Sequence, residues 1–548
     1  MVRVAAVQFE AGTDRAANLA ACLRMIDEAA ATGAQLIVLP EFCNHLSWYA
    51  DRAEARARAL REGDEFLTAI AGASKKHGTY VKINVTYAHE DGRTGGTNLM
   101  FDPTGAIVGR CDKQTLMGAE NDFLNPGSDV GPILDTPLGR LGMYACMEGV
   151  ITEVARGLAL RGAQLLLNSL ISFARDEASL HIPVRAAENK VWVVAANKVG
   201  PLLPREHLPA ISARLGVPPE WLHGAGESQI VAPDGTVVAK APRTGEAVVV
   251  ADIDPGRADD KRRPDGTHIF AVRRPALYRS LAQPPRDPDR VDAAPSLPVA
   301  IVRTDQTAAP GDADSGAVAL IHTELAAGAK LIVLPPFTGG VAELAGALAG
   351  SDAHVVTTVI EGGAQVGVVI SADGVIARQP QLHASPAFPD TGDELVPLDL
   401  PWGRLAIVVG DDAVHPELFR MAAIAGCDVV AVPFVAQEAW ETSLGLLERA
   451  AENRLNVVAA TPQDQPGLIL GLTGDFTLWT SWDGPFTGRI SHPLVTLVPA
   501  GEATGRATIA PAQAANRFVS KQTNLVNGRP WRLLDAIVQP TDAYQTID

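Results

Sequence analysis

Short apolar runs alternate with longer amphipathic segments in the first part of the chain. Runs rich in Val, Ile and Leu are typical of buried strands, whereas apolar residues three and four positions apart are typical of helices. We expect strands at residues 3–8 and 34–39, and helices at residues 16–31 and 53–77. This alternation predicts an α/β fold built from layers of strands and helices.

The same pattern continues through the first half of the chain. Further strands are expected at residues 80–86, 99–101, 141–145, 165–168, 191–197 and 228–232. Glycine-containing turns at residues 102–105 and 233–235 each join two such runs. Turns of this composition predict β-hairpins among the α/β units.

The second half of the chain repeats motifs of the first half in the same order. AQLIVLPEF at residues 34–42 returns as AKLIVLPPF at 329–337, TPLGRLG at 136–142 as LPWGRLA at 400–406, RAAEN at 185–189 unchanged at 449–453, and Arg274-Pro275 as Arg529-Pro530. Ordered matches of this kind predict an internal duplication, with the same fold in each copy.

A segment rich in proline and charge separates the two copies. Residues 283–298 read QPPRDPDRVDAAPSLP and show no periodicity, which is typical of an exposed linker. We therefore expect one domain at residues 1–282, the linker at 283–298 and a second domain at 299–548. The length of 548 residues agrees, because it exceeds what one ordinary core supports.

Composition and charge narrow the function. Hydrophobic residues make up 47% and charged residues 20% of the chain, as in a globular protein, and the net charge is −17. With no Lys/Arg-rich run, this charge would repel nucleic acid, so a small-molecule substrate is the better expectation. No apolar run approaches the roughly 20 residues of a membrane helix, and no membrane partner is expected.

The cysteines favour a reducing compartment. The five thiols are scattered, with no CxxC pair and no zinc-type spacing, so we expect no metal site. The apolar residues 2–9 follow no basic region, and we expect no secretory signal. A cytoplasmic protein with reduced thiols is predicted.

Cys146 is the candidate nucleophile. It follows the strand-like residues 141–145 and precedes a helical segment that begins near Ile151, which places it at a strand-to-helix elbow. A helix N-terminus there would lower the pKa of the thiol. A cysteine taken alone is more often a buried structural residue, so its neighbours must decide.

Two charged residues supply that context. Glu41 directly follows Pro40 at the end of a strand, and Lys113 lies in a loop beyond a strand that ends near Val108. Each taken alone would be an ordinary surface charge. Together with Cys146 they provide a base, a cation and a nucleophile, which acyl transfer through a thioester requires.

Three segments resemble the signature regions of the nitrilase superfamily of carbon–nitrogen hydrolases: LPEF at residues 39–42, RCDKQTL at 110–116 and YACME at 144–148. The resemblance covers nearly all of residues 1–282. It implies a Glu-Lys-Cys triad of Glu41, Lys113 and Cys146, with a second glutamate at Glu120, ahead of FLNPG at residues 123–127. No metal or organic cofactor is implied.

The resemblance also implies a mechanism. Glu41 takes the thiol proton and later activates water, while Lys113 and the backbone N–H of Met147 stabilise the developing charge. Glu120 orients the substrate or supports Lys113. The leading function is hydrolysis of a small amide to a carboxylic acid and ammonia or an amine. Nitrile hydrolysis, N-carbamoyl hydrolysis, acyl transfer to another acceptor and a pseudoenzyme scaffold are the alternatives.

Several positions leave the substrate open. Thr115 stands where many members have histidine, and Met147 stands where nitrilases often have tryptophan and aliphatic amidases tyrosine. Glu148 resembles the glutamate of Cys-Trp-Glu in nitrilases, but it also suits a helix start. No substrate-binding residue is assigned; specificity is expected in loops such as residues 44–50 and 201–221.

The second copy lacks the chemistry. Pro336, Gln381 and Gly410 stand opposite Glu41, Lys113 and Cys146, so this domain is expected to be catalytically silent. RAAEN persists in both copies, and we interpret it as a structural motif that holds a helix against the sheet. His181 is expected to be a packed or solvent-facing residue.

The fold implied by the resemblance is a pair of four-layer α-β-β-α lobes packed as an intramolecular pseudo-dimer, with higher homo-oligomers left open. The second lobe should cover apolar helix surface and steady the loops around Cys146.

Overall fold

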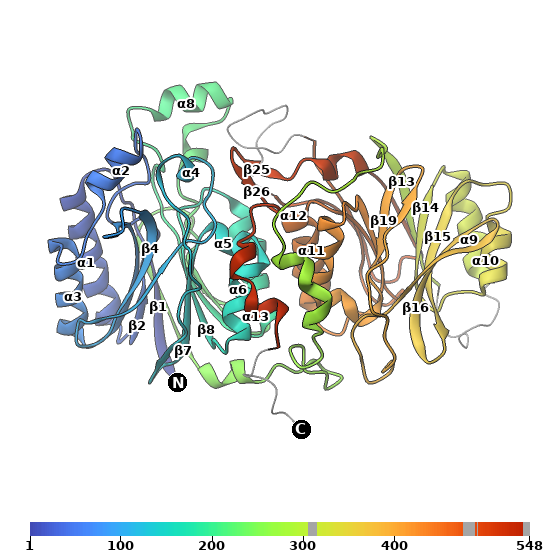
Figure 1. The fold of residues 1–548 in the computed structure, drawn as a ribbon, viewed down its shortest axis with the longest axis horizontal. Coiled ribbons are helices and arrows are strands. Elements are labelled where there is room, and N and C mark those ends of the chain that lie inside the picture. Colours follow the sequence, from blue (N-terminus) through green and yellow to red (C-terminus); the bar gives the residue numbers. More distant parts are fainter. Residues whose placement is uncertain (305–314, 475–487, 490, 541–548) are drawn as a thin grey trace.

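The computed structural model describes residues 1–304, 315–474, 488, 489 and 491–540. The first lobe contains two six-stranded sheets (Figure 1). The outer sheet has the order β12 (Ala247–Ile253), β1 (Val2–Gln8), β2 (Leu36–Val38), β3 (Tyr80–Ala88), β4 (Thr94–Phe101), β5 (Ile107–Asp112). The inner sheet has the order β11 (Val237–Lys240), β10 (Gln229–Val231), β9 (Trp192–Ala196), β8 (Leu165–Ser169), β7 (Gly139–Ala145), β6 (Leu134–Thr136).

Helices cover both outward faces of this sheet pair. Helices α1 (Arg15–Ala31) and α3 (Glu65–His77) pack on the outer sheet, and α6 (Thr152–Leu160) and α7 (Ile182–Asn189) pack on the inner sheet. A separate apolar core fills the space between the two sheets. Shorter helices lie in the connecting loops: α2 (Arg52–Arg58), α4 (Glu120–Phe123), α5 (Met147–Val150) and α8 (Leu208–Leu215).

The second lobe repeats this arrangement. One sheet has the order β17 (Gly374–Pro380), β16 (Ala364–Ser371), β15 (His354–Glu361), β14 (Leu331–Pro336), β13 (Leu297–Val302), β24 (Thr504–Ile509). The other has the order β18 (Leu398–Leu400), β19 (Gly403–Ile407), β20 (Val429–Pro433), β21 (Asn456–Ala460), β22 (Gly467–Gly471), β23 (Leu494–Val498). The outer helices are α9 (Ser315–Ala326) and α10 (Val341–Ala347), and the inner helices are α11 (Pro416–Ile424) and α12 (Leu446–Asn453).

The two lobes meet through their inner helices, and α6, α11 and α12 lie at the centre of the molecule (Figure 1). Helix α7 contacts η6 (Glu441–Gly445) of the second lobe in the same interface. Helix α13 (Asp535–Val538), near the end of the chain, packs back on α6. A hairpin of β25 (Phe518–Ser520) and β26 (Thr523–Asn524) lies at the same junction. The predicted pair of α-β-β-α lobes is confirmed.

Short 3-10 and π helices complete the connections. They are η1 (Glu177–His181), η2 (Pro219–Leu222), η3 (Pro255–Asp259), η4 (Pro275–Ala282), η5 (Gly410–Val414), η6 (Glu441–Gly445), η7 (Pro511–Ala515) and η8 (Trp531–Leu533). Within the described residues, no helix is both long and apolar enough to cross a bilayer.

The expected single helix at residues 53–77 is wrong. The chain leaves helical geometry at Ala59, and Leu60 forms a β-bridge with Tyr87. A new helix, α3, then starts where the Asp64 side chain accepts a hydrogen bond from the N–H of Phe66. An N-cap of this kind satisfies an otherwise unpaired donor, and here it outweighs the continuous amphipathic pattern.

Two boundaries also differ from expectation. Strand β5 continues to Asp112, so Lys113 follows the strand directly and does not lie in a loop beyond Val108. Strand β13 starts at Leu297, inside the segment expected to be a linker, where it pairs with β24. Both predicted hairpins are confirmed, since residues 102–105 join β4 to β5 and residues 233–235 join β10 to β11.

Candidate active site

Cys146 occupies a sharp elbow between β7 and α5. Its backbone has φ 50° and ψ −110°, a conformation that is rare for a residue with a Cβ and costs about 1–3 kcal/mol. The backbone N–H of Cys146 donates to Ser169 O and to Asn168 Oδ1, each at 3.0 Å. These contacts hold the elbow against β8. The next long helix, α6, starts at Thr152, close to the expected position near Ile151.

The structure brings all four expected side chains together. The Nζ atom of Lys113 lies 2.7 Å from Glu41 Oε1 and 2.7 Å from Glu120 Oε2. The Glu120 carboxylate also accepts a hydrogen bond from the N–H of Met117 at 2.9 Å. Glu41, Lys113 and Glu120 are buried beside Cys146, and charge interactions link each of them to its thiol.

Burial and charge set the resting protonation of this cluster. Burial, together with the charge of Glu41, raises the pKa of the Cys146 thiol well above its ordinary value, although Lys113 opposes the shift. Burial would lower the pKa of Lys113, but Glu120 and Glu41 raise it well above its ordinary value. The expectation that a helix N-terminus makes a thiolate is therefore wrong, because burial dominates and α5 is a single turn. A base must remove the thiol proton.

Glu41 is placed to be that base. Burial raises the pKa of Glu41, while the charge of Lys113 and the interaction with the Cys146 thiol pull it down. A carboxylate with a raised pKa accepts a proton more readily than an ordinary one. The same contact gives the proton a short path from the sulfur to the carboxylate.

Glu148 has a structural task that the sequence did not show. Its Oε1 accepts from Gln114 N at 2.7 Å and its Oε2 accepts from Ala145 N at 2.8 Å. Burial raises its pKa to about 7. One side chain thus connects the segment after Lys113 to the residue before Cys146. In the second lobe Asp412 likewise accepts from the N–H of Leu382.

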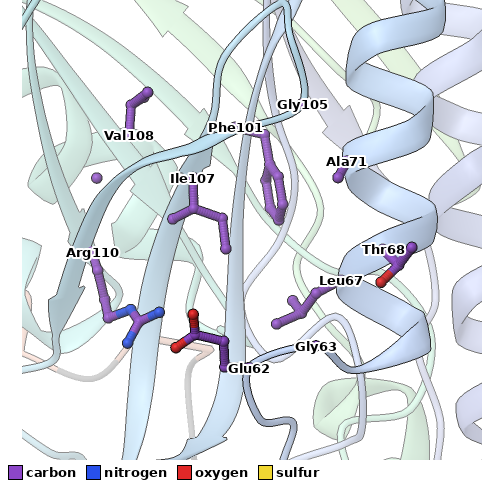
Figure 2. Close-up of a pocket in the computed structure, with 11 residues that line it drawn as sticks. Glu62, Gly63, Leu67, Thr68, Ala71, Phe101, Gly105, Ile107, Val108 and Arg110 are labelled. Atoms are coloured by element: carbon purple, nitrogen blue, oxygen red, sulfur yellow. The ribbon is translucent and has the colours of Figure 1, made fainter.

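A cavity of about 340 Å³ opens over Cys146. Ser47 and Trp48 line it from one expected specificity loop, and Leu202, Leu203 and Ile211 line it from the other. Two larger hollows do not include the four candidate residues. One, of about 610 Å³, lies between α3 and the edge strand β5 (Figure 2), and the other, of about 700 Å³, adjoins Arg175 and Trp221.

The RAAEN motif is structural, as expected, but it does more than hold a helix on the sheet. Arg185 donates from Nε to Gly149 O at 2.8 Å and from Nη2 to Val150 O at 3.1 Å, both in the helix that follows Cys146. The same guanidinium pairs with Glu448 and, at 2.8 Å, with Glu452 of the second lobe. The motif therefore connects the elbow to the lobe interface.

Other buried charges cross the interface in matched pairs. Arg156 of α6 pairs with Glu417 of α11 at 2.9 Å, and Arg420 of α11 pairs with Glu153 of α6 at 2.7 Å. His181 is packed, as one reading of the sequence expected, with Nδ1 2.8 Å from Glu448 Oε2. Burial opposes its charge, but Glu448 and Asp176 raise the pKa of His181 well above its ordinary value.

The second lobe keeps the backbone of the site without its chemistry. Gly410 has φ 53°, matching Cys146, and its neighbours Gln365 and Gln381 occupy the space beside it. Gln381 N donates to Gln365 O at 2.8 Å, just as Lys113 N donates to Gly96 O at 2.8 Å. These shared features support the alignment of Gly410 with Cys146 and of Gln381 with Lys113.

Each lobe sends an equivalent hairpin to the other. In the first lobe, Arg262 pairs with His268 after η3; in the second, Phe518 pairs with Asn524 after η7. Arg263 of the first hairpin pairs with Asp411 at 2.5 Å and with Glu441 at 3.0 Å, next to Gly410. The second hairpin instead reaches the elbow of Cys146.

Comparison with known proteins gives relatives for the first lobe. The sequence model of the carbon-nitrogen hydrolase family matches residues 3–263. A nitrilase of Pyrococcus abyssi is 29% identical over 281 residues, which cover 51% of this chain and 99% of the relative. An N-carbamoylputrescine amidase of Arabidopsis thaliana is 27% identical over 298 residues, which cover 51% of this chain and 95% of the relative.

Among solved structures, an amidase from Nesterenkonia sp. AN1 is similar at 21% identity with a TM-score of 0.39, covering 48% of this chain and 97% of its own. Residues 3–263, nearly all of the first lobe, thus match the carbon-nitrogen hydrolase family and resemble the nitrilase superfamily. The relatives that match this part of the chain are named as nitrilases and amidases, which hydrolyse carbon–nitrogen bonds.

Proposed function

We propose that the first domain, residues 1–282, hydrolyses a small-molecule amide through a thioester on Cys146, and that the second domain, residues 299–548, is catalytically silent. The observation that carries this proposal is the buried contact of Lys113 with Glu41 and Glu120 at the Cys146 elbow, beneath a cavity. A base, a cation and a thiol in that arrangement suit acyl transfer.

The first half of the reaction breaks the carbon–nitrogen bond. Glu41 takes the proton of Cys146 as the sulfur attacks the amide carbon. Lys113 and the N–H of Met147 stabilise the negative charge that forms on the amide oxygen. The tetrahedral intermediate then collapses, Glu41 returns the proton to the nitrogen, and ammonia or an amine leaves.

The second half regenerates the thiol. Glu41 takes a proton from water as the water oxygen attacks the thioester carbon. The carbon–sulfur bond breaks, the carboxylic acid leaves, and the proton returns to the sulfur. Glu120 keeps Lys113 in position through both halves, because its carboxylate lies 2.7 Å from Nζ.

We expect amides to be better substrates than nitriles and N-carbamoyl compounds. Met147, in place of the tryptophan common in nitrilases, packs into an apolar cluster with Val519 and Leu203. Transfer of the acyl group to an acceptor other than water would use the same thioester. Hydroxylamine distinguishes the two outcomes, since a transferase would form hydroxamate in preference to the free acid.

The test is ammonia release from a panel of amides, nitriles and carbamoyl compounds. Cys146→Ala should lower turnover at least about 10⁴-fold with the fold intact, as loss of a covalent nucleophile does. Cys427→Ala, which removes a buried thiol in the second lobe, serves as the matched control. A Cys146→Ala enzyme with near-normal ammonia release would contradict the proposal.

The rate should also depend on pH in a defined direction. Glu41 must be ionised to accept the thiol proton, and burial raises its pKa. The acidic limb of kcat/KM should therefore lie at higher pH than an ordinary carboxylate gives, with activity rising as the pH rises. Glu120→Gln removes a like charge that raises the pKa of Glu41, so the limb should move to lower pH.

A further inference from the structure

The second lobe touches the active-site loop through the β25–β26 hairpin. Thr523 Oγ1 accepts a hydrogen bond from Gly118 N at 2.7 Å and donates to Leu116 O at 3.0 Å. Gln522 Nε2 donates to Asp122 Oδ1 at 2.7 Å. These contacts join residues that lie about 400 positions apart in the sequence.

The clamped loop belongs to the catalytic machinery. It carries Glu120, whose carboxylate holds Lys113. Gly118 has φ +52°, and a Cβ there would come within 2.8 Å of Ser520 Oγ, so the Ser520 side chain packs directly against the backbone of Gly118. Val519 of the hairpin is fully buried in one apolar cluster with Met147, next to the thiol. The hairpin therefore packs against both sides of the site.

The same hairpin forms part of the cavity wall, because Ser520 and Lys521 line it together with first-lobe residues. The rest of the wall is mainly apolar, with Trp48, Met117, Phe123, Ile171, Phe173, Leu202, Leu203, Ile211 and Leu222. A volume of about 340 Å³ lies near the small end of the range of ligand pockets, about 300–1,000 Å³.

Charge at the cavity disfavours a cation. Within the part of the chain that the structure describes, the acidic side chains lining the cavity are Glu120 and Asp122. Glu120 is engaged by Lys113, and Asp122 faces Lys521 at 3.7 Å and accepts from Gln522. Arg214 and Lys521 add positive charge to the wall. A buried ammonium group without a carboxylate partner is strongly unfavourable.

We propose that the silent second lobe supplies a wall of the substrate cavity through the hairpin Phe518–Asn524, and that this cavity selects small amides whose acyl group is apolar and carries no positive charge. This inference rests on the proposed function, because it names the substrate class of that site. In this proposal Lys521 is a specificity residue and Thr523 is a positioning residue, and both belong to the lobe that has no catalysis of its own.

Three primary amides of similar length test the selection: hexanamide, 6-aminohexanamide and the monoamide of adipic acid. For the wild-type protein, kcat/KM should be at least about 100-fold higher for hexanamide than for 6-aminohexanamide, since the site leaves the ammonium unpaired. Lys521→Glu should raise kcat/KM about tenfold for the cationic amide and lower it for the anionic one. Lys75→Glu, on the exposed outer face, should change neither.

Thr523→Val tests the clamp. It should lower kcat/KM about tenfold or more and change the preference among the three amides, with a small fall in the urea unfolding midpoint because two buried hydrogen bonds are lost. Thr508→Val, an exposed position in β24, is the matched control. A uniform loss for all substrates, accompanied by a large fall in the unfolding midpoint, would show only a structural role and would overturn this part of the inference.

Binding of the three amides can also be compared without turnover. The measurement is how strongly each amide slows the labelling of Cys146 by iodoacetamide. Better protection or faster hydrolysis with 6-aminohexanamide would overturn the inference, as would equal effects of Lys521→Glu on all three amides. Failure of the proposed function would give a different result. The Cys146→Ala protein would still hydrolyse amides, regardless of which of the three amides is preferred. If hydrolysis depends on Cys146 but is faster with the cationic amide, the proposed substrate class is wrong and the proposed function still stands.

Discussion

Replacing Glu417 with glutamine removes a carboxylate that two arginines of the first lobe share. Glu417 Oε1 lies 2.9 Å from Arg156 Nε and 3.0 Å from Arg273 Nε. All three side chains are at most 2% exposed. The substitution keeps the shape of the side chain and leaves two guanidinium groups buried without their anion.

The expected loss of stability is about 3–5 kcal/mol, the usual cost of removing one partner of a buried ion pair. Glu153 provides a comparison within the same interface, because it pairs with Arg420 of the second lobe. Glu153→Gln should cost less than Glu417→Gln, since fewer guanidinium groups lose a carboxylate. Glu361→Gln, which breaks an exposed pair with Arg378, should cost about 1 kcal/mol or less.

The assay is urea unfolding followed by tryptophan fluorescence, repeated from pH 7 down to pH 3. Burial would raise the pKa of Glu417, but Arg156 and Arg273 hold it well below its usual range. A lowered pKa contributes stability above the unfolded-state pKa and loses it as the pH falls toward the folded-state value. The gap between wild type and Glu417→Gln should therefore shrink below about pH 4.

A Glu417→Gln protein that loses less than the exposed control at pH 7 would refute the reasoning. So would a stability gap that widens on acidification, because protonation of Glu417 can only remove the attraction.

Three further outcomes follow from the interface, the elbow and the residue after the thiol. A chain ending at Arg290 should aggregate, self-associate or lose activity, because the apolar and charged faces of α6 and α7 become exposed; a truncated lobe that stays monomeric and fully active would contradict this. Glu148→Gln should lower kcat at least about tenfold with little change in KM, because the Lys113 and Cys146 segments lose one connection. A matched amide should be hydrolysed faster than its nitrile, and faster acid formation from the nitrile would reverse this ranking of substrates.

The sequence predicted the fold because its signals are local. Buried strands such as β8 and glycine turns such as residues 102–105 are readable in a short window. The duplication was visible because scaffold motifs repeat in order. The break between α2 and α3 was missed, because the amphipathic pattern hid the local N-cap at Asp64 and the bridge between Leu60 and Tyr87 lies outside any short window.

In the candidate site, too, local features could be predicted from the sequence and long-range contacts could not. Glu41, Lys113, Glu120 and Cys146 were found through motif resemblance, and the structure brings them together. The crossing contacts were not readable, because Gly118 and Thr523 are 405 positions apart. The pKa of the thiol was misjudged for a related reason: burial depends on the whole fold, whereas the helix start is local.

The reciprocal hairpins give the two lobes unequal evolutionary freedom. In a homodimer one gene encodes both surfaces, so a substitution that improves one exchanged hairpin alters the other as well. In this chain the two positions are separate codons. Val519 can stay apolar beside the thiol while its counterpart Arg263 forms ion pairs with Asp411 and Glu441 beside Gly410. Selection can therefore adjust the cavity wall from a lobe in which Pro336, Gln381 and Gly410 stand at the positions of the triad.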